Sequence, residues 1–534
     1  MSATSLPLLA LKLTDDTDAA LQGVTRRGGL STDDEEASRR RRLAVHIPVP
    51  TDGATRLNRI AAELRLPTTA SSLAARWRTS VQASMSFKQQ MYTRERDEIQ
   101  GELFDAQAKA TSFVRQARSS GLADSQTSTW DVVERVSNRW QSLVLQSAAL
   151  DRIVETAKQR SDLIQNAVDF AKQKFEFAFA LESLAADYPS LPVLLEGVAD
   201  LVDAFIKQPL VTNGAFLNFV LLGEPGVGKT RLATALANVM GKVGLLVYDQ
   251  LVVCGRSDFI GEWEGQTATK SRTFLTSNLE KCCFLDEGYS LTTYDRDQRC
   301  EGDRRRLSAY SEEAVAELVG FLSQRVGSFS LITAGYEQQM LNDFLPSNAG
   351  LGRRFPYRVW LQKYSPGQLV DIFLTALASA LSDPPPAPRL TRETAQTFFT
   401  ALGIAFLTDI LGSIHSDDQS LQVYPLLGGV FAAQAGAMST LASTAAVLIA
   451  STKRRGEIGI SNNGIDTWAI GYIDIYDILI TLLQQQLGPS AGDAIIEVQA
   501  IARVNGWLVD GAWQVPPERL SSQPSLRVRK TKTR

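Results

Sequence analysis

A glycine-rich segment has the residue types and spacing of a phosphate-binding loop. The apolar residues 219–222 (FVLL) lead into the loop, and apolar residues at helical spacing follow it. The loop itself reads Gly223, Glu224, Pro225, Gly226, Val227, Gly228, Lys229, Thr230. Glycines let backbone N–H groups close around phosphate oxygens at a helix N-terminus, where the helix dipole favours anions. Lys229 is placed to reach the β- and γ-phosphates and Thr230 to bind Mg²⁺, so the segment predicts a nucleoside triphosphate site.

Two adjacent acids follow a second apolar run. Residues 281–285 (KCCFL) are typical of a buried strand, and Asp286 and Glu287 come directly after them. Asp286 is suited to hold the Mg²⁺ shell, and Glu287 to polarise the attacking water. Together with the phosphate loop, this pair favours an ATPase over a GTPase or a small-molecule kinase.

The elements that position these residues alternate between strands and helices. Apolar runs predict strands at 219–222, 244–251, 281–287 and 328–336, and a helix at 312–322. This alternation indicates an α/β fold with a parallel sheet, whose ligands bind at the carboxyl ends of the strands. A charged stretch at 292–311 is expected to be a solvated loop beside the acidic strand.

Composition bounds the class of protein. The chain has 534 residues, 44% of them hydrophobic and 21% charged, which describes a globular protein of about three domains. Its net charge of −3 gives no electrostatic case for a nucleic-acid partner. Its 4 cysteines are too few for a disulfide framework, and its 2 histidines argue against zinc sites and Ser-His-Asp triads.

The position of the cysteines and the residues at the start of the sequence favour a cytoplasmic location. Cys282 and Cys283 lie in a predicted buried strand, which suits a reducing compartment, and no basic segment with an apolar core begins the chain. The run Arg39–Arg42 fits either a nuclear-import or acidic-partner patch or, as we prefer, a solvated charge run.

The flanking regions differ from the centre. Residues 1–70 are expected to be a disordered linker, because acidic and arginine runs with few aromatic residues cannot offset chain entropy. Residues 71–190 have helical spacing, with a seam from Val133 to Phe175 that predicts one long helix in a bundle or coiled coil. This region is either structural or an adaptor for oligomerisation. Pro189–Pro209 is read as a hinge.

The C-terminal part is predicted to be helical over 376–490 and to end, over 491–534, in a hairpin and a basic tail. Residues 419–452 carry no charge, which raises the question of a membrane span. Their content of Ala, Ser, Thr and Gly favours a buried helix. Residues 507–515 predict the hairpin, with its turn at Asp510-Gly511.

Five segments, by their order and spacing, resemble the AAA+ ATPases. They are Gly223–Thr230, 258–268 (DFIGEWEGQTA), 284–289 (FLDEGY), 333–344 (TAGYEQQMLNDF) and 348–356 (NAGLGRRFP). Within that superfamily they most resemble the group of CbbX and stage V sporulation protein K, which includes red-type Rubisco activases and an ATPase of type VII secretion systems. The resemblance covers about residues 195–375. It implies a P-loop AAA+ core followed by a helical lid.

The resemblance also implies a ring, usually a hexamer, that hydrolyses ATP with Mg²⁺ and pulls a protein client through a central pore. Trp263 occupies the aromatic position of the pore loop, and acids on both sides of it disfavour a buried side chain. Arg354 matches the arginine finger, which would stabilise charge on the phosphoryl group bound by a neighbouring subunit. Arg353 stands where the family often has serine, so which arginine acts is open. Tyr336 falls at the sensor position.

One departure from the family concerns the lid. The family carries a Gly-Asn-Ala-Arg motif whose arginine senses the γ-phosphate. The nearest counterpart, Gly428–Phe431, has no arginine, and none follows until Arg454. Either that sensor is missing or the lid is rebuilt around the uncharged segment.

Three hypotheses follow. The first is an ATP-driven machine that threads or remodels a partner protein. The second is a nucleotide-gated scaffold with slow regulatory hydrolysis, in which the N-terminal helices bind partners. The third, a membrane-tethered ATPase, depends on residues 419–452 and is the one we favour least.

Overall fold

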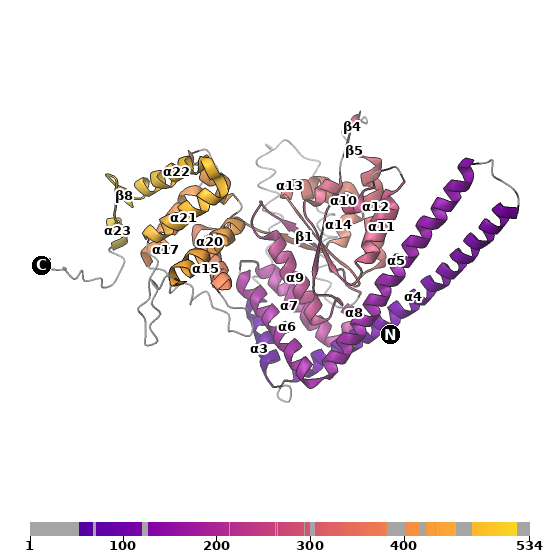
Figure 1. Ribbon diagram of the computed structural model, residues 1–534. Helices are drawn as coiled ribbons and strands as arrows, with labels where there is room; N and C mark the ends of the chain where they lie inside the picture. Colours follow the sequence, from indigo (N-terminus) through magenta and orange to yellow (C-terminus); the bar gives the residue numbers. More distant parts are fainter. Residues whose placement is uncertain are drawn as a thin grey trace, which may run out of the picture. The chain divides into compact units, whose positions relative to one another are not determined.

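The computed structural model describes most of the chain as two compact units (Figure 1). The described residues are 53–67, 71–119, 126–188, 190–212, 214–261, 263, 265–292, 294–299, 305–381, 401–415, 423–432, 434–454 and 472–520. The first unit comprises the described residues up to Leu222 together with Lys229–Trp360, and the second comprises Gly223–Gly228 and the described residues from Leu361 onwards.

The first unit is built on a five-stranded sheet in the order β2-β3-β6-β1-β7. The strands are β1 (Phe219–Leu222), β2 (Leu251–Cys254), β3 (Cys282–Leu285), β6 (Ser330–Gly335) and β7 (Tyr357–Trp360). Every neighbouring pair is parallel. The predicted α/β fold with a parallel sheet is therefore confirmed. The carboxyl ends of β1, β3 and β6, all fully buried strands, meet at one edge.

Helices and short turns connect these strands. They are α9 (Lys229–Val243), α10 (Arg256–Phe259), α11 (Thr267–Ser277), η1 (Gly288–Leu291), α12 (Ala309–Gln324), α13 (Glu337–Gln339), η2 (Met340–Phe344), η3 (Leu345–Ser347) and α14 (Leu351–Arg354). The helix predicted at 312–322 is confirmed as α12. The expectation of a loop throughout 292–311 is wrong, because β4 (Tyr294–Arg299) and β5 (Arg305–Leu307) pair there as antiparallel strands.

An all-α region precedes the sheet, as predicted. Its helices are α3 (Gly53–Arg65), α4 (Ser72–Ser119), α5 (Gln126–Gln165), α6 (Ala167–Asp187), α7 (Pro192–Lys207) and α8 (Pro209–Thr212). Two predictions fail here. The linker assigned to residues 1–70 includes α3, which buries Leu57, Ile60 and Leu64 at helical spacing. The hinge assigned to Pro189–Pro209 is mostly α7, where Pro192 occupies the first turn and leaves no backbone donor unpaired.

The single long helix predicted from the 133–175 seam is divided. α5 ends at Gln165 and α6 begins at Ala167, and the side chain of Asn166 caps α6 by accepting a hydrogen bond from the N–H of Val168 at 2.9 Å. An asparagine that satisfies a free amide competes with continuation of the helix, and apolar periodicity does not reveal this. α4 and α5 lie side by side as an antiparallel pair (Figure 1).

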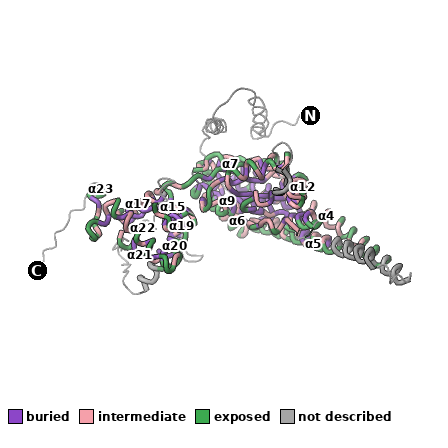
Figure 2. The backbone as a smooth tube through the Cα atoms, turned by 90° about the horizontal axis from the view of Figure 1, so that it is seen from above, coloured by how far each residue is buried: buried purple, intermediate pink, exposed green. Residues whose placement is uncertain are grey.

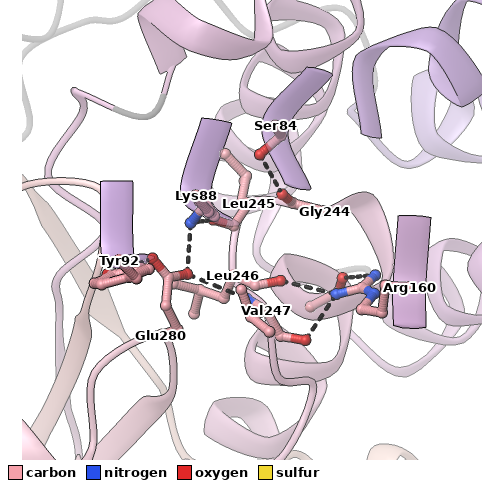
Figure 3. A network of polar contacts seen from close by, with 10 residues as sticks. Ser84, Lys88, Tyr92, Arg160, Gly244, Leu245, Leu246, Val247 and Glu280 are labelled. Atoms are coloured by element: carbon pink, nitrogen blue, oxygen red, sulfur yellow. Dashed lines mark hydrogen bonds and ion pairs between the residues drawn. The ribbon is translucent and has the colours of Figure 1, made fainter. Parts of the chain in front are cut away.

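The second strand was predicted at 244–251, but β2 begins only at Leu251. Gly244 has a φ angle of +101°. Side chains of the N-terminal helices donate hydrogen bonds to the carbonyl groups of residues 244–247 (Figure 3). Ser84 donates to the oxygen of Gly244, Lys88 to that of Leu245, and Arg160 to those of Leu246 and Val247. The apolar side chains are buried as in a strand, but the carbonyl groups of residues 244–247 accept from helix side chains instead of pairing with a strand.

The second unit is helical and has its own core (Figure 2). Its elements are α15 (Pro366–Leu381), α17 (Ala401–His415), α19 (Pro425–Phe431), α20 (Ala435–Arg454), α21 (Tyr472–Leu487), η4 (Gly488–Ser490), α22 (Ala491–Val504), β8 (Leu508–Val509), β9 (Ala512–Trp513) and α23 (Pro517–Leu520). Residues 491–504 are thus helical, which the assignment of 491–534 to a hairpin and tail did not include. The hairpin is confirmed, with positive φ at Asp510 and Gly511.

The described part of the uncharged segment 419–452 forms α19 and most of α20, and α20 packs into that core through Met438, Leu441 and Ala445. Among the described helices, none alone has the length and apolar composition to cross a bilayer. α19 and the first part of α20 meet that criterion only as a pair, and they are bent by 89°.

Candidate active site

The loop between β1 and α9 is shaped by glycines. Gly226 and Gly228 have φ angles of +72° and +88°, which residues with a side chain rarely adopt. A Cβ atom at Gly223 would lie 2.6 Å from the carbonyl oxygen of Leu361, so only glycine fits. α9 begins at Lys229, its first turn carries no acidic residue, and Thr230 is exposed. This backbone is suited to an anion at the helix N-terminus.

Later residues of the second unit bond the carbonyl groups of this loop. The N–H of Ala435 donates to the oxygen of Gly226 at 3.0 Å. The hydroxyl of Tyr364 donates to the oxygen of Val227 at 2.9 Å, and the Tyr364 N–H donates to Oε1 of Gln434 at 3.1 Å. Sequence reasoning singled out neither Tyr364 nor Gln434, because neither belongs to a local motif.

The acidic pair stands on a strained turn at the end of β3. Asp286 and Glu287 are exposed, and Oδ1 of Asp286 accepts a hydrogen bond from the N–H of Glu287 at 3.1 Å. Glu287 has a φ angle of +50°, a left-handed conformation that is unusual for a residue with a side chain. At Gly288 a Cβ atom would lie 2.1 Å from Oγ1 of Thr333, so glycine lets the turn approach β6. The turn thus holds both carboxylates toward solvent.

Tyr289 connects two of the predicted residues. Its hydroxyl feels the negative charge of Glu287, and its ring lies 6.3 Å from that of Tyr336, which follows β6. Burial, followed by the negative charge of Glu287, raises the pKa of Tyr289 to about 12. The hydroxyl is protonated near neutral pH and is available as a donor to the Glu287 carboxylate. Sequence reasoning missed this residue, although its place three positions after Asp286 was a usable signal.

Trp263 lies on the loop between α10 and α11, and 70% of its surface is exposed. Both ends of this loop are anchored, since Oγ1 of Thr267 accepts from the N–H of Gly261 at 3.1 Å and Ser271 donates to the carbonyl of Phe259 at 2.8 Å. At the start of α10, Arg256 donates to the carbonyl oxygen of Ser290 in η1. The tryptophan loop is therefore tied to the turn that carries Asp286 and Glu287.

The two candidate finger arginines end α14 and differ in their contacts. Arg354 donates from Nη2 to Oγ of Ser323 at 2.8 Å and from Nη1 to the carbonyl oxygen of Gly350 at 3.0 Å. Arg353 is exposed, and within the described residues it makes no hydrogen bond or ion pair. Arg354 is thus held within its own subunit here, whereas Arg353 faces solvent.

The sheet brings part of the predicted site together. Leu222 pairs with Gly335 and Thr333 pairs with Leu285, so the residues that follow β1, β3 and β6 share one edge. Asp286, Glu287 and Tyr336 stand there. Trp263 and the arginines are on separate elements. The acids flanking Trp263 and the run Arg39–Arg42 lie outside the described residues.

A parallel sheet with a glycine loop after one strand and a strand-ending acidic pair is the arrangement of P-loop ATPases. Residues 219–357 match the family model "ATPase family associated with various cellular activities (AAA)". The chain therefore contains an AAA-family ATPase domain, and the predicted resemblance is confirmed.

Curated relatives agree with this assignment. The ESX-2 secretion system protein EccA2 of Mycobacterium tuberculosis (strain ATCC 25618 / H37Rv) is 28% identical over 306 residues, which are 55% of this chain and 46% of the relative. Stage V sporulation protein K of Bacillus subtilis (strain 168) is 32% identical over 166 residues, 31% of this chain and 48% of the relative. The chain thus spans about half the length of these relatives.

Among solved structures, a chain of the E. coli MS115-1 HORMA:CdnC:Trip13 complex aligns with 44% of this chain and 78% of its own length. Its sequence identity is 10% and its TM-score 0.28.

Proposed function

We propose that this chain hydrolyses ATP and uses the energy to remodel a partner protein. The loop amides and Lys229 bind the phosphates, Glu287 polarises the attacking water, and Tyr289 holds the Glu287 carboxylate in place. Tyr336, whose ring lies next to that of Tyr289, helps to orient the water. The exposed carboxylates of Asp286 and Glu287 support this assignment of roles.

Mg²⁺ fits the residues present. The hydroxyl of Thr230 and the carboxylate of Asp286 are exposed oxygen ligands of the kind that Mg²⁺ prefers. When bound, the ion would neutralise charge on the phosphates. Thr230 begins α9 and Asp286 ends β3, so each would hold the ion from a fixed element.

The exposure of Trp263 carries the remodelling proposal. A large aromatic side chain that is 70% exposed on an anchored loop offers a rigid apolar surface for contact with a partner. Its loop begins at α10, where Arg256 bonds η1 just beyond Glu287, so movement of the acidic turn would reach the tryptophan. We propose that Trp263 grips an extended polypeptide in the central pore of a homo-oligomeric ring, which we take to be a hexamer.

The Trp263→Ala variant tests this proposal. It should hydrolyse ATP at the wild-type rate but lose the stimulation of that rate by an unfolded model polypeptide such as reduced casein. Trp140→Ala, which removes a 45% exposed tryptophan from α5, is the matched control and should keep the stimulation. Full stimulation in Trp263→Ala would remove the threading proposal.

The ring proposal requires a residue contributed by a neighbouring subunit. Arg354→Ala should bind ATP without hydrolysing it, and so should subunits with Glu287→Gln. Mixing Arg354→Ala with Lys229→Ala subunits should restore some turnover, because an intact phosphate site then meets an intact finger. A mixture as inactive as its two components would argue against a finger acting in trans.

The long α4–α5 pair favours a second candidate, a scaffold whose assembly is gated by nucleotide. The Glu287→Gln variant separates the two functions. A motor should trap its client in ATP when hydrolysis stops, whereas a scaffold with slow hydrolysis should assemble and turn over much as before. Unchanged assembly and ATP turnover in Glu287→Gln would exclude the motor.

A further inference from the structure

Two carbonyl groups of the phosphate loop, those of Gly226 and Val227, accept hydrogen bonds. The N–H group of each of these two peptide units points away from its carbonyl group. In a trans peptide the C=O and N–H groups point in opposite directions. The oxygen of Gly226 shares its peptide unit with the N–H of Val227, and the oxygen of Val227 shares its unit with the N–H of Gly228. Since Ala435 and Tyr364 hold both oxygens, the amides of Val227 and Gly228 are turned to the other side.

We propose that Tyr364 is a positioning residue for nucleotide binding. Its hydroxyl, together with the N–H of Ala435, orients the loop so that the amides of Val227 and Gly228 are presented to the phosphates. The inference rests on the proposed ATP-binding function and adds to it a residue 137 positions beyond the loop. The hydroxyl also lies close to Gly228, where a Cβ atom would be 3.6 Å from it, an ordinary van der Waals contact.

Gln434 fixes Tyr364 in turn. Its side-chain oxygen accepts from the Tyr364 N–H, and the residue is only 5% exposed. Gln434 adopts a φ angle of +34°, an unfavourable conformation directly before α20. This conformation places the side chain on Tyr364 while the following N–H, that of Ala435, reaches Gly226. The loop is thus held at two adjacent peptide units by the start of one helix and by the tyrosine that it supports.

This arrangement gives the helical region after Leu361 a way to respond to nucleotide without an arginine. Phosphates would bind the N–H ends of the two peptide units, whereas Tyr364 and Ala435 bind their carbonyl ends. Each interaction stabilises the orientation that the other requires, so by linkage nucleotide binding also strengthens the contacts of Tyr364 and Ala435. Nucleotide binding and these contacts therefore remain coupled although Gly428–Phe431 lacks the arginine that the family carries in its lid.

Tyr364→Phe is the direct test, because it removes one hydroxyl and keeps the ring. Loss of one such hydrogen bond should raise the Kd of a fluorescent ATPγS derivative by about 2- to 13-fold. The rate at saturating ATP should change less than the KM. Tyr476→Phe is the matched control, because it removes a buried hydroxyl of the same unit, which accepts from Gln499 at 2.8 Å, and it should leave the Kd unchanged.

A second readout separates positioning from general stability. In the wild-type protein, ATPγS should slow amide hydrogen exchange at the start of α20, and this protection should be reduced in Tyr364→Phe. Gln434→Met, which keeps side-chain length but accepts no comparable bond, should shift both readouts in the same direction. A wild-type Kd and full protection in Tyr364→Phe would overturn the inference, and so would an equal loss in Tyr476→Phe.

The Lys229→Ala variant distinguishes failure of the role proposed for Tyr364 from failure of the proposed nucleotide site. If Lys229→Ala binds the nucleotide as well as the wild type, the proposed nucleotide site itself is wrong. If Lys229→Ala loses binding while Tyr364→Phe binds normally, only the role of Tyr364 is wrong.

Discussion

Removing the ammonium group of Lys88 should destabilise the first unit far more than removing a surface charge. The Lys88 and Glu280 side chains are 1% and 0% exposed, and they form an ion pair between α4 and the turn that precedes β3 (Figure 3). Burial lowers the pKa of Lys88, and the charge of Glu280 opposes that shift. Lys88→Met keeps most of the side-chain volume but leaves the Glu280 carboxylate buried without its cation, and the carbonyl of Leu245 without its donor.

The magnitude follows from this burial. Removing one partner of a buried ion pair lowers the free energy of unfolding by about 3–5 kcal/mol, whereas an exposed pair contributes about 0–1 kcal/mol to it. Arg272→Met is the control, since its pair with Glu317 is 61% exposed on the arginine side. In thermal unfolding followed by circular dichroism, Lys88→Met should lower the Tm by roughly 3–10 °C and Arg272→Met by about 2 °C or less.

A double variant checks the mechanism. Glu280→Gln added to Lys88→Met removes the unpaired charge, while the amide oxygen can still accept from Tyr92, whose hydroxyl lies 2.7 Å from Oε1 of Glu280. The double variant should therefore be more stable than Lys88→Met alone. If Lys88→Met costs no more than Arg272→Met, or if the double variant is the less stable of the two, the reasoning from burial is refuted.

Three further outcomes are expected. Tyr289→Phe should lower kcat several-fold in steady-state ATPase assays with little change in KM, because only the orientation of the catalytic carboxylate is lost; a rise confined to KM would contradict this role. Arg354→Ala should abolish hydrolysis and Arg353→Ala reduce it less, and the reverse order would make Arg353 the finger. Burial raises the pKa values of Cys254 and Cys282 to about 12, so only about 1 in 10⁴ of either thiol ionises at pH 8. Iodoacetamide should label them, as seen by peptide mass spectrometry, only after unfolding.

The sequence was informative where a feature is local. β1, β3 and β6 are short apolar runs that end in glycine or acids, and each was predicted close to its observed bounds. Their strand order was not predictable in this way, because it depends on pairing between residues far apart in the chain. β7 was missed, since only one of its residues is buried and no alternation of apolar residues marks it.

Other features were invisible because distant residues create them. The apolar run 244–250 looks like a strand, but its backbone is bonded by side chains that precede it by about 90 to 160 residues. Tyr364 is an ordinary tyrosine in the sequence, and only its contact with Val227 shows that it belongs to the site. Polar contacts of this kind leave no periodicity in the local sequence.

The hydrogen bonds from the N-terminal helices to residues 244–247 also determine where the chain can be truncated without loss of the fold. A truncated protein that starts near residue 195, at the motif-based edge of the ATPase, would lose Ser84, Lys88 and Arg160 together. Removing these helices would expose the apolar surface that they cover, and the Glu280 carboxylate would lose the donors Lys88 and Tyr92. The smallest soluble ATPase fragment should therefore begin at or before Gly53, so that the helices assigned to an accessory region are part of the catalytic folding unit.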